Sequence, residues 1–142
     1  MNDKIFWDSN LWIYLFTKSA DPEDIRKKQH LQNMLKARPY LVSSVQVLNE
    51  VGNALMRKYT FSETDVRGFL EQILLLTENQ PLFKELTFRA LEIKSRYQLG
   101  WYDSLIVTSA LESGCQYLHS EDLHDGLIVE NSLTIKNPFI GI

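Results

Sequence analysis

Ile5-Phe6-Trp7-Asp8-Ser9-Asn10 is the stretch that decides the fold. Its apolar residues 5–7 are too few for a helix and are typical of a strand that is buried on both faces. Residues 11–16, beyond Asp8, have the composition of a helix. A carboxylate at the carboxyl end of a buried strand lies where open α/β sheets place their ligand crevices. The simpler alternative is that Asp8 only caps the following helix, as Asp commonly does.

The rest of the chain alternates between helical and extended patterns. Asp21-Pro22 is a strong helix start, Ser43 and Gln46 have the spacing of a capping box, and Gly114 is placed as a C-terminal cap. We expect helices over residues 21–38, 43–59, 62–74, 86–97 and 103–112, and strands over 39–42, 116–118, 127–129 and 133–135. This alternation predicts an α/β protein, a three-layer α/β/α fold with a mostly parallel central sheet, in a single domain over residues 1–142.

Composition and charge narrow the function only slightly. The formal charge of −3 is not the basic charge expected of a protein that binds nucleic acid through its phosphates. If four of the acids bind a divalent metal, however, the remaining formal charge is −3 + 4 = +1. Net charge therefore neither supports nor excludes a nucleic-acid substrate. The lone Cys115 excludes an internal disulfide and fits a reducing compartment. The sequence has no membrane-length apolar run and no signal-peptide layout, so we expect a cytoplasmic protein.

Four acids on four separate elements are predicted at one edge of the sheet. Asp8 ends the first strand, Glu50 lies on the helix that follows the second, Asp103 opens an apolar helix, and Asp122 comes just after the strand at 116–118. The carboxyl ends of parallel strands meet at one edge, so these carboxylates should repel one another unless a cation lies between them. Oxygen ligands without a Cys or His cluster favour Mg²⁺ or Mn²⁺.

Each acid also has an ordinary explanation. Asp103 could be a simple N-cap, Glu50 could be a solvated residue on a helix face, and Asp122 could be a turn residue. Asp125 lies on the same turn and competes with Asp122 for the fourth position. The joint placement of the four acids is what favours a metal site over these separate explanations.

Four features in order along the chain resemble the PIN domain. They are Asp8-Ser9-Asn10 after a first strand, Ser43 before a helix that carries Glu50, Trp101-Tyr102-Asp103-Ser104-Leu105-Ile106, and Leu118-His119-Ser120-Glu121-Asp122. The set is most similar to the VapC-like toxin ribonucleases of bacterial and archaeal toxin–antitoxin pairs, and it covers essentially the whole chain.

The resemblance implies an endoribonuclease that needs Mg²⁺ or Mn²⁺, with an antitoxin protein as partner and a homodimer as the usual assembly. Asp8, Glu50, Asp103 and Asp122 correspond to the family's catalytic, metal-binding acids. Ser9, Asn10 and Ser120 match polar positions that support them, and Asp122 is favoured over Asp125 because it stands two residues after Ser120. By analogy with two-metal nucleases, the RNA products would carry a 5′-phosphate and a 3′-hydroxyl.

Other residues carry weaker signals. His30, His119 and His124 do not form a ligand set, and Trp7 is expected in the core. Trp101 is a candidate for lining the crevice. Arg57 and Lys58 are the better candidates for phosphate contacts, because Arg57 lies on a helical stripe with Glu50 and Asn53. The run Arg26-Lys27-Lys28 is typical of a solvated helix face.

Two other functions match parts of this pattern. A non-catalytic PIN-like binding module should have lost some of the four acids, and this sequence has all of them. A phosphatase of the haloacid dehalogenase type also has an Asp after the first strand, but it needs a second acid two residues later, where this chain has Asn10.

Overall fold

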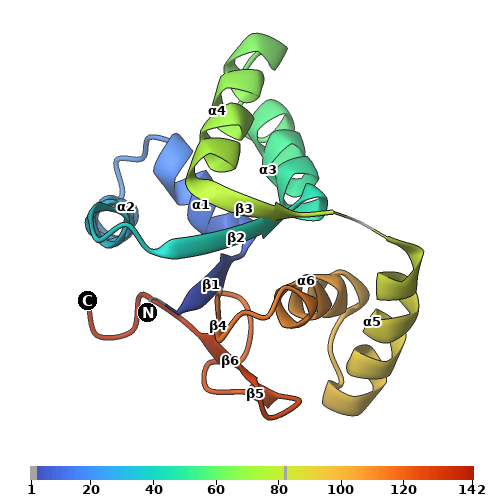
Figure 1. Ribbon diagram of the computed structural model, residues 1–142. Helices are drawn as coiled ribbons and strands as arrows, with labels where there is room; N and C mark the ends of the chain where they lie inside the picture. Colours follow the sequence, from blue (N-terminus) through green and yellow to red (C-terminus); the bar gives the residue numbers. More distant parts are fainter. Residues whose placement is uncertain (1–2, 82) are drawn as a thin grey trace.

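The computed structural model describes residues 3–81 and 83–142 (Figure 1). Among these residues, no helix is both long and apolar enough to cross a membrane. The elements in chain order are β1 (Lys4–Trp7), α1 (Ser9–Phe16), α2 (Pro22–Lys36), β2 (Tyr40–Ser44), α3 (Val45–Arg57), α4 (Glu63–Leu76), β3 (Thr77–Gln80), α5 (Lys84–Tyr97), α6 (Trp101–Glu112), β4 (Tyr117–His119), β5 (Ile128–Val129) and β6 (Leu133–Lys136).

The strands form one mostly parallel sheet in the order β3-β2-β1-β4-β6-β5. Only the short β5, at one end of this order, pairs antiparallel with its neighbour. Helices α1 to α4 lie on one face of the sheet, and α5 and α6 lie on the other (Figure 1). The expected three-layer α/β/α fold with a mostly parallel sheet is therefore confirmed.

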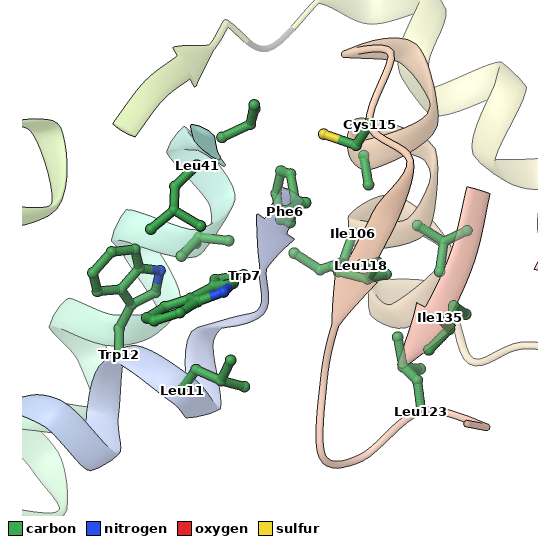
Figure 2. Close-up of a cluster of buried hydrophobic side chains, with 14 of the residues drawn as sticks. Phe6, Trp7, Leu11, Trp12, Leu41, Ile106, Cys115, Leu118, Leu123 and Ile135 are labelled. Atoms are coloured by element: carbon green, nitrogen blue, oxygen red, sulfur yellow. The ribbon is translucent and has the colours of Figure 1, made fainter. Parts of the chain in front are cut away.

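The first strand lies in the middle of the core, as its apolar sequence predicted. Phe6 and Trp7 are fully buried, and Trp7 packs against Trp12 of α1 with 5.1 Å between ring centroids. Figure 2 shows Trp7 and Trp12 beside Leu11, and on the other side of β1 it shows Leu118 of the adjacent β4 and Ile135 of β6, which pairs with β4. Because β1 is paired on both edges and covered on both faces, the position of its last residue is closely determined.

Several local predictions are confirmed. Asp21 caps α2 with its carboxylate, and Pro22 occupies the first helical position. At the end of α6, Gly114 adopts a φ of +74°, where its N–H donates to the carbonyl of Leu111 and the next N–H, of Cys115, donates to Ala110. This is the Schellman arrangement, in which the glycine takes the left-handed conformation that other residues adopt at a cost.

Three local expectations were wrong. Ser44, not Ser43, caps α3, and Ser43 instead extends β2 as a fully buried residue. Helix α6 begins at Trp101 with Gly100 as its cap, so Asp103 is not the N-cap. The strand β3 was not predicted at all, because its sequence Thr-Glu-Asn-Gln has no apolar alternation; it pairs only with β2, at the edge of the sheet.

We predict that Leu118→Ala lowers the free energy of unfolding by about 2–5 kcal/mol. The side chain is fully buried beside β1, so its removal leaves a cavity in the core. Urea denaturation followed by circular dichroism measures the change. Leu75→Ala is the matched control: that leucine is 86% exposed, and its loss should change stability by no more than about 0.5 kcal/mol. Equal effects of the two substitutions would contradict this packing.

Candidate metal-binding acidic site

Asp8 lies at the carboxyl end of β1 and is the most buried of the four acids, with 7% of its surface exposed. It is also the N-cap of α1, where its Oδ1 accepts a hydrogen bond of 2.7 Å from the Ser9 N–H. The capping explanation is therefore confirmed, and it is compatible with the place of Asp8 at the strand end, where open α/β sheets bind their ligands. Capping holds one oxygen in place and leaves the position of Oδ2 to other contacts.

Ser120 holds the second oxygen of Asp8. Its hydroxyl donates to Asp8 Oδ2 at 2.8 Å and accepts from the backbone N–H of Asp122 at 3.2 Å. Ser120 is fully buried just after β4, which pairs with β1. This hydroxyl thus joins the turn that carries Asp122 to the carboxylate of Asp8.

Asp122 extends from this turn and is itself exposed. Its Oδ2 accepts a hydrogen bond of 2.9 Å from Asn10 Nδ2. Asp125 has a different contact: its Oδ1 accepts from the N–H of Asn137 at 2.8 Å. Of the two acids on the turn, Asp122 is the one bonded to the segment after Asp8. The expected support of the acids by Ser9, Asn10 and Ser120 is present as hydrogen bonds.

Glu50 approaches the same edge from α3. It is half-buried rather than a freely solvated helix residue, and its Oε1 lies 3.4 Å from Gln46 Nε2. The same Gln46 nitrogen lies 3.4 Å from the carbonyl oxygen of Tyr102, so Gln46 bridges α3 and the first turn of α6. That turn also carries Asp103, which is exposed and has no capping role.

The electrostatics show that the four acids share one region. Burial raises the pKa of Asp8, hydrogen bonds from Ser120 and Ser9 oppose the rise, and the charges of Asp122 and Asp103 add to it. Burial raises the pKa of Glu50 to about 7, with help from the charges of Asp8 and Asp103. Burial and the charge of Asp122 raise the pKa of Asp103. Each of these carboxylates is destabilised in its charged form by another member of the set.

The donor set fits a divalent cation held partly through water. Among the described residues, no three His, Cys, Asp or Glu side chains lie close enough to hold an ion together. Mg²⁺ requires only one or two carboxylates because it retains several of its waters. The buried Oδ1 of Asn10, next to Asp122, has no hydrogen-bond partner in the part of the chain described, which leaves an unpaired oxygen acceptor beside the acids. A cation would also relieve the mutual repulsion of the acids.

Sequence reasoning missed a network that anchors the same turn. Glu121 accepts a hydrogen bond of 2.7 Å from the Tyr14 hydroxyl and forms an ion pair with Lys27 of α2. This bond to Glu121 raises the pKa of Lys27. Lys27 was assigned to a solvated helix face, and only the fold brings it to a residue 94 positions away. The ion pair with Lys27 neutralises the charge of Glu121. Asp122, by contrast, has no ion-pair partner among the described residues.

The histidines, Trp101 and Lys58 lie in different parts of the fold and differ in burial. His119 is buried in β4, where burial lowers its pKa to about 4, and the three histidines lie on separate elements. Trp101 is half-buried, whereas its neighbour Tyr102 is exposed. Lys58 lines a hollow that also contains Asn10 and Asp122.

Comparison with known proteins agrees with this architecture. A family model for the PIN domain matches residues 5–124. No curated protein sequence matches the chain.

Solved structures share the fold at low sequence identity. VapC20 of Mycobacterium tuberculosis, a Sarcin-Ricin loop cleaving toxin, is 18% identical with a TM-score of 0.66, over 83% of this chain and 89% of that one. A toxin–antitoxin complex from Klebsiella pneumoniae is 18% identical with a TM-score of 0.67, over 95% and 98%. VapBC2 of Rickettsia felis, bound to a DNA fragment from its promoter, is 16% identical with a TM-score of 0.63, over 84% and 88%.

We predict that Glu50→Gln stabilises the metal-free protein by about 1 kcal/mol at pH 8, a value discounted for screening because the side chain is half-exposed. Below pH 4.5 the wild-type carboxyl is protonated in both the folded and the unfolded state. Between 4.5 and about 7 only the folded state keeps the proton, so wild-type stability falls as the pH rises. Above pH 7 Glu50 is charged in both states, and the destabilisation of the folded protein by this charge is complete.

Urea denaturation in EDTA at pH 4 and pH 8 measures this effect. The stability gain of Glu50→Gln should be much larger at pH 8 than at pH 4. The control Glu85→Gln, at an exposed position of α5, should change stability by no more than about 0.5 kcal/mol at both pH values. A gain from Glu50→Gln that does not depend on pH would show that the Glu50 charge is not destabilised by its surroundings.

Proposed function

The chain belongs to the PIN-domain family, and we propose that it is a Mg²⁺- or Mn²⁺-dependent endoribonuclease that acts as the toxin of a VapBC-type toxin–antitoxin pair. The observation that carries the proposal is the convergence of Asp8, Glu50, Asp103 and Asp122, from four elements, on one sheet edge. Their coupled pKa shifts are what a cation site would produce in its metal-free form.

Each residue has a role in this proposal. A bound divalent ion would polarise the scissile phosphate and lower the pKa of an attacking water. Asp8, held at both oxygens by Ser9 and Ser120, is the rigid ligand. Asp103 and Asp122 are exposed, so a cation at this edge would be accessible to their carboxylates. Glu50, whose pKa is raised to about 7 without a cation, would be favoured in its charged form once an ion is bound and could then serve as a ligand.

The partners follow from the same comparison. Two of the similar structures come from toxin–antitoxin assemblies, which supports a cognate antitoxin for this chain. We propose RNA as the substrate because one neighbour is a toxin that cleaves the Sarcin-Ricin loop. A homodimer, a cytoplasmic location and a single domain over residues 1–142 remain proposals on the same basis.

A non-catalytic binding module is the second candidate. It is favoured by one observation, that no three acidic or His side chains of the described residues form a preformed ligand set. The retention of all four acids and their mutual destabilisation favour the nuclease. A haloacid-dehalogenase-type phosphatase has less support still, because the position of its second acid holds Asn10, whose amide donates to Asp122.

We predict that purified protein cleaves a pool of structured RNAs with Mg²⁺ or Mn²⁺, and that EDTA abolishes cleavage. Asp8→Asn and Asp103→Asn should each lower the rate by roughly 100-fold or more, because each removes a charge from the cation site. Gel electrophoresis measures the rate, and end labelling should find 5′-phosphate and 3′-hydroxyl termini. Asn still accepts the Ser9 N–H, so Asp8→Asn should keep the helix cap.

The control is Asp125→Asn, which keeps the acceptor for Asn137 and should retain activity close to that of the wild type. Calorimetry with Mg²⁺ and Mn²⁺ on the same samples separates the two candidate functions. Wild type that binds neither ion at millimolar concentration and cleaves no RNA would overturn the nuclease proposal in favour of the binding module.

A further inference from the structure

Two adjoining hollows extend from the acidic site along the surface. The nearer one, of about 360 Å³, is lined by Asn10 and Asp122 of the site and by Lys58 and Tyr59 at the end of α3. The farther one, of about 380 Å³, is lined by Lys18 of the α1–α2 connection and by Lys28 of α2. Tyr14, Asp24 and Tyr59 line both hollows. We call them together the lysine groove.

The charges of the lysine groove suit an anion. Among the described residues, Lys18, Lys28 and Lys58 are in no ion pair with a carboxylate. Glu121 also lines the nearer hollow, but Lys27 neutralises it. The remaining acid outside the catalytic site, Asp24, accepts a hydrogen bond from the Ser19 hydroxyl at 2.8 Å. In the farther hollow two lysines face the single carboxylate of Asp24, so its formal charge is 2 − 1 = +1.

The walls of the groove are preformed. Tyr14 is held through its hydroxyl by Glu121, and Lys27 Nζ lies 5.1 Å from the centre of its ring. Tyr59 is 37% exposed where the two hollows meet, so its ring is accessible from the groove. An aromatic ring between cationic side chains is the arrangement by which proteins stack unpaired bases while binding the phosphates on either side.

We infer that the lysine groove binds the single-stranded RNA segment that continues from the scissile phosphate, with Lys58, Lys18 and Lys28 contacting phosphates and Tyr59 stacking on a base. The inference rests on the proposed nuclease function and adds the path of the substrate. Its contacts are to phosphates and to a ring face, so the groove supplies affinity with little sequence preference. A base-paired strand cannot present an unstacked base to Tyr59, so the groove selects unpaired RNA.

The test is the affinity for an unstructured 12-nucleotide RNA, measured by fluorescence anisotropy in EDTA so that the RNA stays intact. Lys18→Ala/Lys58→Ala should raise the dissociation constant by roughly tenfold and make the slope of log K against log salt shallower by about 1.4. The control pair Lys36→Ala/Lys94→Ala removes the same charge from exposed lysines outside both hollows and should change the dissociation constant by less than about twofold. Because both double variants lose the same charge, a larger loss of affinity in Lys18→Ala/Lys58→Ala would come from contacts in the groove and not from net charge.

Two substitutions of Tyr59 test the stacking contact separately from the lysines. Tyr59→Leu should weaken binding by roughly tenfold, whereas Tyr59→Phe keeps the ring and should bind like the wild type. A blunt RNA duplex should bind more weakly than the 12-mer and should show no difference between these two variants. Equal loss in both variants would assign any effect to the hydroxyl and overturn the stacking role.

The outcomes separate this inference from the proposed function. If the wild type cleaves RNA with Mg²⁺ or Mn²⁺ while the Lys18→Ala/Lys58→Ala variant binds and cleaves like the control variant, the groove does not hold RNA and the nuclease proposal stands. If the 12-mer binds through these lysines but is never cleaved with either ion, the inference stands and the nuclease proposal fails. If the wild type binds no RNA, the inference is overturned.

Discussion

The burial of β1 on both faces is the constraint on which the candidate site depends. Trp7 and Phe6 are fully enclosed, and β1 is paired with β2 and β4 in parallel register. A strand held in this way cannot shift by one residue without exposing its aromatic side chains. The position of Asp8 at its end is therefore set by packing of the core, and the carboxylate is held at the edge of the sheet although its charged form is disfavoured there.

The raised pKa values at this edge of the sheet reflect the free-energy cost of holding several carboxylates close together. Burial and neighbouring negative charges raise the pKa of Asp8, Glu50 and Asp103 together. Hydrogen bonds from Ser9 and Ser120 offset part of this cost at Asp8, and a hydrogen bond from Gln46 offsets part of it at Glu50. The remaining repulsion is a source of binding energy for a cation, because a cation that binds the folded state relieves it and stabilises the fold at the same time.

The turn after β4 connects the site to the groove beside it. Ser120 bonds to Asp8, Asp122 bonds to Asn10, and the residue between them, Glu121, bonds to Tyr14 and Lys27. Alternate residues of the turn thus face the acidic site, while Glu121 faces the nearer hollow. In the proposed nuclease, one short segment would position an acid and also fix the wall along which the substrate lies.

The sequence by itself determined the features that depend on local chemistry. The apolar run before Asp8, the Asp21-Pro22 helix start and the left-handed Gly114 are confirmed, because each depends on the residues immediately around it. The four acids could be named because strand ends share an edge in any parallel sheet. Only the tertiary structure decided what depends on residues far apart in the chain. It paired the polar β3 with β2, which no local pattern predicts. It brought Lys27 to Glu121 and Lys58 to a hollow with Asp122, and it raised the pKa of Glu50, because contacts, burial and neighbouring charges arise only when separate elements pack together.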